Sequence, residues 1–384
     1  MQSRERVLTT LAHREPDRVP RDLGGTHVST IARTAYAKLR AHLGLEPKPP
    51  KWLDVVQQVV TPHDDILDRF RIDTRGLFPL TSHNWDVHGK LVDEGDHWRY
   101  DDEWRMTQHF PKGGYWFSVV GQPLRDAEPT PESIEAHPWP GAANPARVAG
   151  LRAQAQAYRD AGQCVMVKGL CAGIFEMAQR LRGMENALTD PLMYPEMADR
   201  LYGVLADLKA AFWEMALEEL GDVVDIVVEN DDYGAQLSQI ISYEQYRDTI
   251  HPHLMRVFAT IKKAAPDAKL FFHSCGNVRP FLPGWIEAGV DILNPVHTRA
   301  KDMDPAELKR DFGDALTFWG GGVDTQDVLP RGTPAEVRDD VRRNLDIFAP
   351  GGGYVFTTVH NIQAEVPPEN IVALFEAADE FGVD

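Results

Sequence analysis

The chain has 384 residues, 43% of them hydrophobic, which is enough for one large α/β domain or two smaller ones. Its formal net charge of −18 argues against a nucleic-acid or anionic-membrane surface, and it contains no apolar run of the roughly 18 residues needed to span a bilayer. The first residues lack an apolar signal-peptide core, and three scattered cysteines form no disulfide framework, so we expect a cytoplasmic protein.

The first 125 residues are predicted to form two additions to the main domain. Helices are expected over 4–13 and 29–43, and the region 51–80 is interpreted as helical until a strand at 74–79. Residues 1–70 are thus an N-terminal helical extension. In 85–125, short aromatic segments alternate with turn signals, which is typical of an inserted β-hairpin or meander. Its aromatic side chains either cover a pocket or pack the hairpin onto the body.

From residue 145 onward the pattern alternates between helix and strand. Such serial units with Val- and Ile-rich strands indicate a parallel sheet, so we predict one (β/α)8 TIM barrel domain over 1–384. A doubly wound sheet is the alternative, but the sequence has no Gly-x-Gly-x-x-Gly after a first strand. The predicted strands are 76–78, 165–167, 223–228, 270–272, 290–293, 316–319 and 354–359, with 19–21 as a candidate eighth. The main predicted helices are 146–161, 174–183, 195–220, 243–264, 334–348 and 368–381.

The strand at 270–272 ends in a His-x-Cys pair, His273 and Cys275, followed by a Gly-Asn turn signal. Residues i and i+2 of a strand point to one face, so the imidazole and the thiol can close on one metal ion, zinc before others. The alternative is that both side chains simply pack in the core.

In a (β/α)8 barrel, chemistry sits at the carboxyl ends of the strands. A His, a Cys and a second His from separate strands form a three-ligand set that leaves a fourth position for substrate or water. Some of the acids can instead cap the following helices, and the glycine-rich segment from Asp22 to His27 is either a ligand-facing loop or an ordinary turn. The polar residues selected by the strand-end rule are Glu229, Asn230, Asp231, Asp232, His273, Cys275, Asn294, His297, Asp324, His360 and Gln363.

Several motifs together resemble the uroporphyrinogen decarboxylase superfamily along nearly the whole chain. They are Arg4-Glu5-Arg6, Pro16-Asp17-Arg18-Val19-Pro20, Gly173-Ile174-Phe175-Glu176, His273-Ser274-Cys275-Gly276-Asn277, Gly289-Val290-Asp291-Ile292-Leu293-Asn294-Pro295, Gly322-Val323-Asp324 and Val366-Pro367-Pro368-Glu369-Asn370-Ile371. The resemblance implies a (β/α)8 barrel with extra N-terminal helices, and suggests a homodimer. It also implies one of two chemistries.

One branch decarboxylates a porphyrinogen without a cofactor, and its substrate carboxylates are gripped by an Arg-Gln-Ala-Gly-Arg motif that this chain lacks. The resemblance makes Asp65 the counterpart of that branch's key aspartate, with Arg21 or Arg75 left to hold substrate. The other branch contains zinc- and corrinoid-dependent methyltransferases. His273 and Cys275 match its His-x-Cys pair, but His360, nine residues before Glu369, stands where that branch has a cysteine.

Our leading hypothesis is therefore a zinc methyltransferase with Zn²⁺ on His273, Cys275 and His360, and a corrinoid methyl carrier on a partner protein. Glu229 or Asp232 handles the proton or the fourth coordination position. Cofactor-free decarboxylation through Asp65 is the alternative, and a non-catalytic binding protein on an inherited barrel is a third possibility. We expect a small-molecule substrate held by Asp22, His27, Asn294, Asp324 and Gln363.

Overall fold

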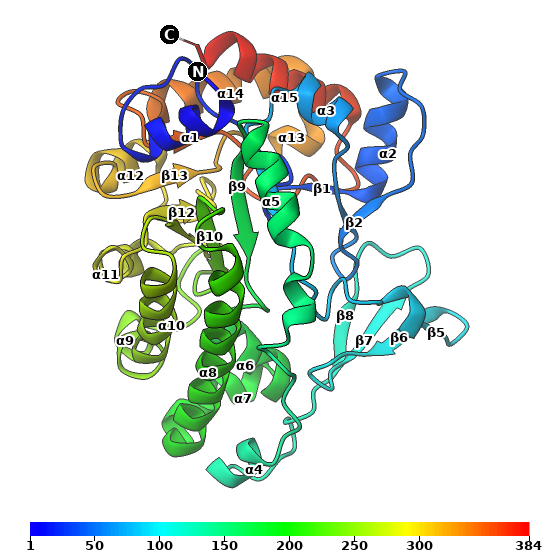
Figure 1. The fold of residues 1–384 in the computed structure, drawn as a ribbon, viewed down its shortest axis with the longest axis vertical. Helices are drawn as coiled ribbons and strands as arrows, with labels where there is room; N and C mark the ends of the chain where they lie inside the picture. Colours follow the sequence, from blue (N-terminus) through cyan, green and yellow to red (C-terminus); the bar gives the residue numbers. More distant parts are fainter. Residues whose placement is uncertain (384) are drawn as a thin grey trace.

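Seven parallel strands form the barrel wall, in the order β14-β13-β12-β11-β10-β9-β4 (Figure 1). The structure, a computed structural model, describes residues 1–383. All seven predicted barrel strands are confirmed. Their bounds are β4 (Thr74–Leu77), β9 (Cys164–Lys168), β10 (Ile226–Asn230), β11 (Lys269–His273), β12 (Ile292–Asn294), β13 (Thr317–Trp319) and β14 (Tyr354–Val355).

The segment around Arg21 fills the position between the two edge strands of this sheet. Arg21 forms a parallel bridge with Phe356, just after β14. On its other side its carbonyl accepts a hydrogen bond from the N–H of Asp73, just before β4, at 2.9 Å. The predicted eighth strand is thus present as a single bridge, and the (β/α)8 barrel is confirmed.

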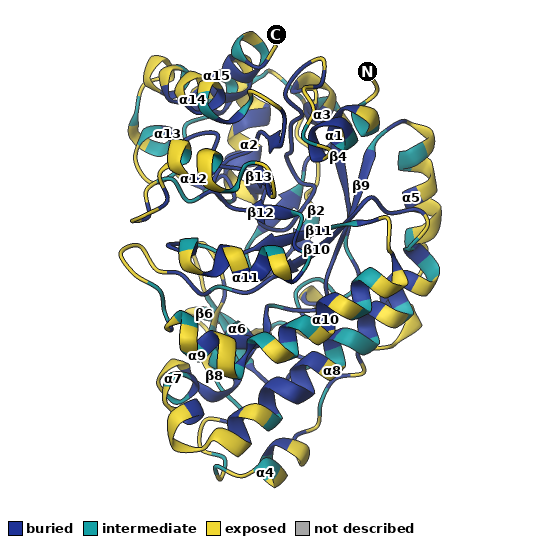
Figure 2. Ribbon diagram, turned by 90° about the vertical axis from the view of Figure 1, so that its left-hand side faces the viewer, coloured by how far each residue is buried: buried dark blue, intermediate teal, exposed yellow. Residues whose placement is uncertain are grey.

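Alternate residues of each strand fill the barrel interior, as the two-residue period of a strand requires. The interior cluster contains Met166, Val228 and Phe271 from neighbouring strands, together with Val7 and Leu11 of α1 (Ser3–Leu11). Helix α1 therefore closes the amino-terminal end of the barrel, and β9 points away from it in Figure 1. The strands are the buried centre of the molecule in Figure 2.

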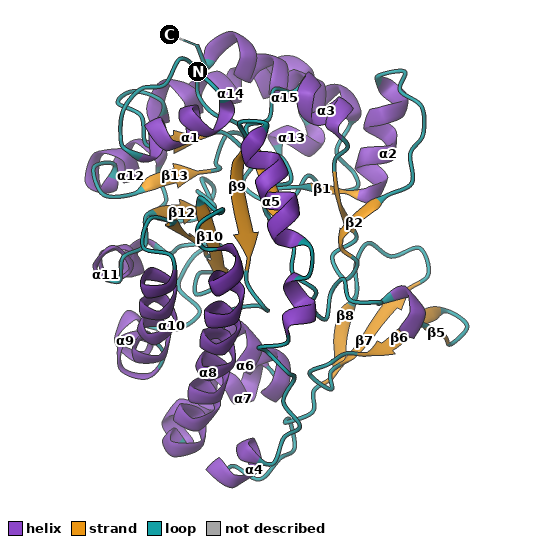
Figure 3. Ribbon diagram, in the orientation of Figure 1, coloured by secondary structure: helices purple, strands orange, loops and turns teal. Residues whose placement is uncertain are grey.

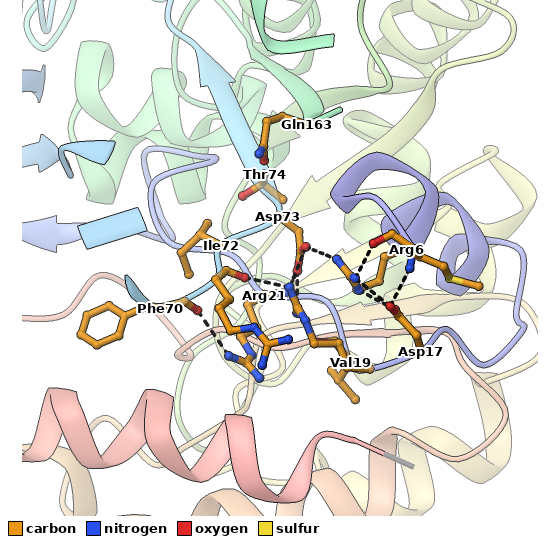
Figure 4. A network of polar contacts seen from close by, with 12 residues as sticks. Arg6, Asp17, Val19, Arg21, Phe70, Ile72, Asp73, Thr74 and Gln163 are labelled. Carbon is orange, nitrogen blue, oxygen red and sulfur yellow. Dashed lines mark hydrogen bonds and ion pairs between the residues drawn. The ribbon is translucent and has the colours of Figure 1, made fainter. Parts of the chain in front are cut away.

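A charged network lies where the N-terminal segment meets the barrel (Figure 4). Arg6 bridges Asp17 at 2.6 Å and the fully buried Asp73 at 2.7 Å, and Arg18 also pairs with Asp73 at 2.9 Å. The backbone N–H of Arg21 donates to the same carboxylate at 2.9 Å. The N-terminal motifs of the resemblance therefore hold the barrel's closing segment in place.

An outer layer of helices covers the strands (Figure 3). The predictions for 195–220, 334–348 and 368–381 coincide with α8, α14 and α15. The single helix predicted over 243–264 is wrong: α9 ends at Thr249 and α10 begins at His251, next to Pro252, which lacks a backbone N–H. The layer comprises α5 (Leu151–Asp160), α6 (Ile174–Arg182), α7 (Met184–Met193), α8 (Pro195–Leu220), α9 (Tyr243–Thr249), α10 (His251–Ala264), α11 (Leu282–Glu287), α12 (Pro305–Phe312), α13 (Val328–Arg331), α14 (Pro334–Phe348) and α15 (Pro368–Phe381), and α4 (Pro131–Glu135) contacts α8.

The N-terminal extension is less helical than predicted. Residues 51–61 contain β2 (Lys51–Asp54) and β3 (Val59–Thr61). Strand β3 is the centre of an antiparallel sheet and pairs with β2 on one side and with β1 (Ile31–Ala32) on the other. The valines at 59 and 60 favour a strand over a helix because their branched side chains restrict rotamers in a helix. In the sequence, helix α2 (Arg33–His42) lies between β1 and β2, and α3 (Asp64–Arg69) follows β3.

The predicted inserted hairpin is an antiparallel sheet of four strands, β5-β6-β7-β8, set apart from the barrel in Figure 1. Its Tyr100 and Phe117 rings pack edge to face and join a small core with Val55 and Val56. No helix among residues 1–383 is both long and apolar enough to cross a membrane. The strands of this sheet are β5 (Val92–Asp93), β6 (His97–Asp101), β7 (Thr107–Pro111) and β8 (Ser118–Gly121).

Candidate metal centre and active site

The His-x-Cys pair lies at the carboxyl end of β11, as predicted. His273 is in register with Asn230 of β10 and Asn294 of β12, on the inward-facing side of the sheet. Gly276 has φ +84°, and a Cβ there would lie 2.4 Å from the carbonyl carbon of Gly234. This turn, which only glycine fits, leaves the Cys275 sulfur 3.5 Å from Nε2 of His273.

The loop that carries His360 is anchored by the two residues that follow it. The carboxamide of Asn361 accepts a hydrogen bond from the N–H of Thr30 at 2.9 Å and donates to the carbonyl of His27 at 3.0 Å. Ile362 is buried and forms a parallel bridge with Ile31. These contacts position the His360 ring 5.5 Å from that of His273, centroid to centroid.

The ligand atoms of His273, Cys275 and His360 all lie within 4.8 Å of one another. In a tetrahedral zinc site the bond lengths separate a sulfur from a nitrogen ligand by about 3.6 Å, close to the 3.5 Å between Cys275 and His273. Asn294 donates from Nδ2 to the carbonyl of Trp319, so its Oδ1 accepts from Nδ1 of His273. That hydrogen bond leaves the Nε2 lone pair facing the sulfur, so the three side chains fit a zinc ion.

The electrostatics of the cluster keep both imidazoles neutral. Burial, followed by the neighbouring His273 and His297, lowers the pKa of His360 to about 3, and burial also lowers the pKa of His273. Burial raises the pKa of the Cys275 thiol. Two neutral imidazoles are ready to coordinate a metal, and the thiol would release its proton on binding one.

Asp232 lies beside this cluster and lines the same cavity as His273 and His360. Its Oδ1 accepts a hydrogen bond from the N–H of Cys275 at 2.7 Å and lies 3.9 Å from Nε2 of His273. Burial, followed by the negative charge of Glu176, raises the pKa of Asp232. A carboxyl group in this environment can hold or release a proton close to neutral pH.

The cavity has a volume of about 390 Å³ and lies between the strand ends and the inserted sheet. Trp104, Met106 and Phe117 of the inserted region form part of its lining, while Tyr100 is directed into the small core instead. The aromatic side chains of the insertion thus have both roles that the sequence left open: some pack the sheet and others cover the pocket.

The comparisons with known proteins agree with this fold. A sequence profile described as "Uroporphyrinogen decarboxylase (URO-D)" matches residues 116–381. The chain belongs to the uroporphyrinogen decarboxylase family. A solved structure titled "methyltransferase from Methanosarcina mazei" covers 99% of both chains with a TM-score of 0.63 and 16% identity, which shows a shared fold.

Curated relatives match over shorter stretches. A protein named uroporphyrinogen decarboxylase from Legionella pneumophila (strain Lens) is 25% identical over 189 residues, covering 49% of this chain and 50% of the relative. One of the same name from Pseudoalteromonas translucida is 32% identical over 101 residues, covering 25% of this chain and 27% of the relative. The chain therefore spans about half the length, or less, of these relatives, within a family of enzymes.

Two of the predicted catalytic residues of this URO-D family member lie outside the cavity. Glu229 follows the inward-facing Val228, so it points out of the barrel, where it pairs with Lys209 at 2.8 Å and accepts from Trp213 at 2.5 Å. Asp65 is in α3 and pairs with Arg40 at 2.9 Å and Lys48 at 2.8 Å. Neither carboxylate is placed to act on a ligand in the cavity.

Only some of the predicted substrate-binding residues lie at the cavity or contact the metal cluster. His27 lines the cavity, and Asn294 orients His273. Asp22 is fully buried and accepts four hydrogen bonds, from Gly25, Ser29, Thr74 and Trp319. Asp324 accepts from the N–H groups of Gln326 and Asp327, as a turn cap does, and Gln363 donates to the carbonyl of Asn361. Asp22, Asp324 and Gln363 do not line the cavity and have structural contacts instead.

The arginines assigned to the decarboxylase alternative are also structural. Arg21 is fully buried, donates to the carbonyls of Phe70 and Ala378, and pairs with Asp379. Arg75 donates to the carbonyls of Ile72 and Thr74. Neither guanidinium lines the cavity.

The sequence analysis missed several residues that do line the cavity: His83, Lys168, Cys171, Glu176 and Arg180. The strand-end rule could have selected Lys168, because it ends a predicted strand and lies two residues after Met166, whose side chain is inside the barrel. Cys171, three residues after Lys168, also lines the cavity. Glu176 and Arg180 lie on α6 and had no strand-end signal.

Proposed function

We propose that this chain is a zinc-dependent methyltransferase that moves a methyl group between a small molecule and a corrinoid carrier on a partner protein. The observation that carries the proposal is the convergence of His273, Cys275 and His360, whose ligand atoms lie within 4.8 Å of one another, with both histidines lining the cavity. A zinc ion bound there would act as a Lewis acid toward a substrate heteroatom in the fourth coordination position.

The chain's own residues prepare the site for such a reaction. Asn294 fixes the tautomer of His273 through the 2.5 Å hydrogen bond to Nδ1. Asp232, 3.9 Å from the same imidazole, takes or returns the proton of the substrate heteroatom. The inserted sheet limits the access of water to the cavity through Trp104 and Phe117.

Decarboxylation, the reaction named in the curated relatives, is the second candidate. The residues that the sequence analysis assigned to this reaction are absent from the cavity, because Asp65, Arg21 and Arg75 all lie outside it. The two candidates also differ in their need for metal, since the decarboxylase branch uses none.

A methyl-transfer assay separates the two. The zinc-loaded protein is incubated with methylcobalamin and a panel of small thiols, and methylated products are measured by mass spectrometry. We expect His273→Ala and His360→Ala to reduce the rate at least about 100-fold, as expected for loss of a metal ligand. Asp65→Asn should match the wild type. Release of CO₂ from a carboxylated substrate in excess chelator, with no loss in His273→Ala, would instead establish the decarboxylase.

A further inference from the structure

A lysine lies inside the barrel at the cavity, and no residue of 1–383 forms a hydrogen bond or ion pair with it. Lys168 ends β9, and its strand neighbours at the same face, Cys164 and Met166, belong to the interior cluster. The side chain is 8% exposed and lines the cavity. An ammonium group taken out of water without an anionic partner is unfavourable, so the site calls for an anion.

The other charges around Lys168 are already compensated. Lys209 is paired with Glu229 at 2.8 Å, and Arg180 with Glu176 at 3.2 Å. The buried Asp54 accepts hydrogen bonds from His83 at 2.8 Å and from the backbone N–H and the side-chain Nε2 of Gln57. The charge of Asp54 acts on Lys168 from beyond ion-pair distance, so Lys168 is the one cation among the described cavity-lining residues without a direct anionic partner.

A second polar group lies beside this charge. His27 lines the cavity, and its Nδ1 is buried without a hydrogen-bond partner among the described residues. Burial, followed by the charge of Lys168, lowers the pKa of His27 well below its usual value, so the ring is neutral and carries one N–H. One cation and one neutral hydrogen-bond donor suit a ligand group with one negative charge better than a group with two negative charges.

Part of the remaining lining is apolar. Trp104, Met106 and Phe117 come from the inserted region, and Leu170 and Met177 from the barrel. Trp116 stands at the same cavity and is 54% exposed, which places an aromatic ring at the opening. Such a surface buries an apolar or aromatic ligand body.

We propose that the cavity binds a small organic acid, with its carboxylate held by Lys168 and His27 and its apolar body against the side chains of the inserted sheet. The inference names the substrate class of the methyltransferase and rests on that proposed function for the role of the acid as substrate. In this binding orientation the other end of the ligand is free to reach His273 and His360 in the same cavity.

Isothermal titration calorimetry tests this proposal. It measures the binding of benzoate, benzamide and inorganic phosphate to protein that a chelator has stripped of metal. Benzamide has the shape of benzoate without its charge, and metal-free protein excludes coordination of the carboxylate by zinc. We expect Lys168→Met to weaken benzoate binding at least about tenfold, as expected for loss of a charge-assisted hydrogen bond. Lys168→Arg should retain binding within about threefold, and benzamide binding should be unchanged in both variants.

Lys301→Met is the matched control, because it removes the same charge from an exposed position. Equal losses of benzoate and benzamide in Lys168→Met would overturn the proposal, as would tighter binding of phosphate than of benzoate. A protein that binds zinc but not benzoate contradicts only this inference, and one that binds benzoate but not zinc contradicts only the proposed function.

Discussion

The carboxamide oxygen of Asn294 accepts a hydrogen bond from Nδ1 of His273 at 2.5 Å, and its amide group donates to the Trp319 carbonyl at 2.7 Å. The second contact fixes which way the amide faces, so the first fixes the histidine tautomer. An imidazole held in this way presents Nε2 to the cavity and to Cys275. Asn294, which the sequence analysis assigned to substrate, thus has a positioning role one strand away from the histidine.

Replacing Asn294 with leucine should therefore weaken zinc binding without removing a ligand. We expect the zinc dissociation constant to rise about 10–100-fold, because an unoriented imidazole loses affinity for the metal. Competition with a chromogenic chelator at fixed pH measures this. Unchanged affinity in a variant that keeps the wild-type circular dichroism spectrum would show that the hydrogen bond does not prepare a metal ligand.

Asn361→Ala tests how His360 is positioned. The change removes the acceptor of the buried Thr30 N–H, which should lower the free energy of unfolding by about 1–3 kcal/mol and weaken zinc binding about tenfold. Asn370→Ala is a matched control, because Asn370 is also buried and donates to the carbonyls of Leu329 and Gly332. It should lower stability in urea unfolding and leave the zinc affinity intact. Equal effects of both variants on zinc would contradict the anchoring role of Asn361.

Substitutions of Glu229 and Asp232 should have opposite effects on stability and on the methyl-transfer rate, although both residues were predicted to be catalytic. Glu229→Gln leaves Lys209 buried without its anion, so we expect a loss of about 3–5 kcal/mol in the free energy of unfolding, with zinc still bound. Asp232→Asn should change stability by less than about 1 kcal/mol and reduce the methyl-transfer rate about 10²–10⁴-fold, as expected for loss of a general acid or base. Urea unfolding and the rate assay measure the two effects, and the reverse pattern would place the catalytic carboxylate on the outside of the barrel.

Acidification should selectively remove the contribution of Asp54 to stability. Burial opposes its charge, but His83 and Lys168 hold the pKa of Asp54 well below its usual range. Its folded pKa lies below the unfolded value of about 3.9, so the carboxylate stabilises the fold above that pH, and this stabilisation is lost as the pH falls toward the folded pKa. We expect Asp54→Asn to cost about 1–3 kcal/mol at pH 7 and progressively less below about pH 4, measured by urea unfolding at several pH values. A difference that stays constant or grows on acidification would contradict this assignment.

The barrel could be predicted from the sequence because its strands are apolar runs bounded by turn signals, and α8, α14 and α15 each begin with proline in the first turn. The strand-end rule also found His273, Cys275 and His360, which the structure brings together. The rule gave wrong assignments because it did not consider which face of the strand each side chain occupies. Glu229 and Lys168 both stand at strand ends, but the two-residue alternation sends Glu229 toward α8 and Lys168 into the cavity.

Other features depend on contacts that the local sequence does not show. Asp65 lies in the first turn of α3, and its partners Arg40 and Lys48 are 25 and 17 residues away in the chain. The strands at 51–61 are short and pair with each other, and the second of them also pairs with Ile31 and Ala32, which lie far earlier in the chain. Long-range pairing of this kind overrides a weak local preference.

The most direct test of a zinc site on His273, Cys275 and His360 is the zinc-edge X-ray absorption spectrum of the purified protein and of its His360→Ala variant, with Asp65→Asn as control. We predict about one zinc ion per chain with sulfur and nitrogen neighbours, loss of one nitrogen neighbour or of the zinc itself in His360→Ala, and no change in Asp65→Asn. A protein that binds no zinc after loading, or an unchanged zinc environment in His360→Ala, would contradict the site and the methyl-transfer function proposed from it.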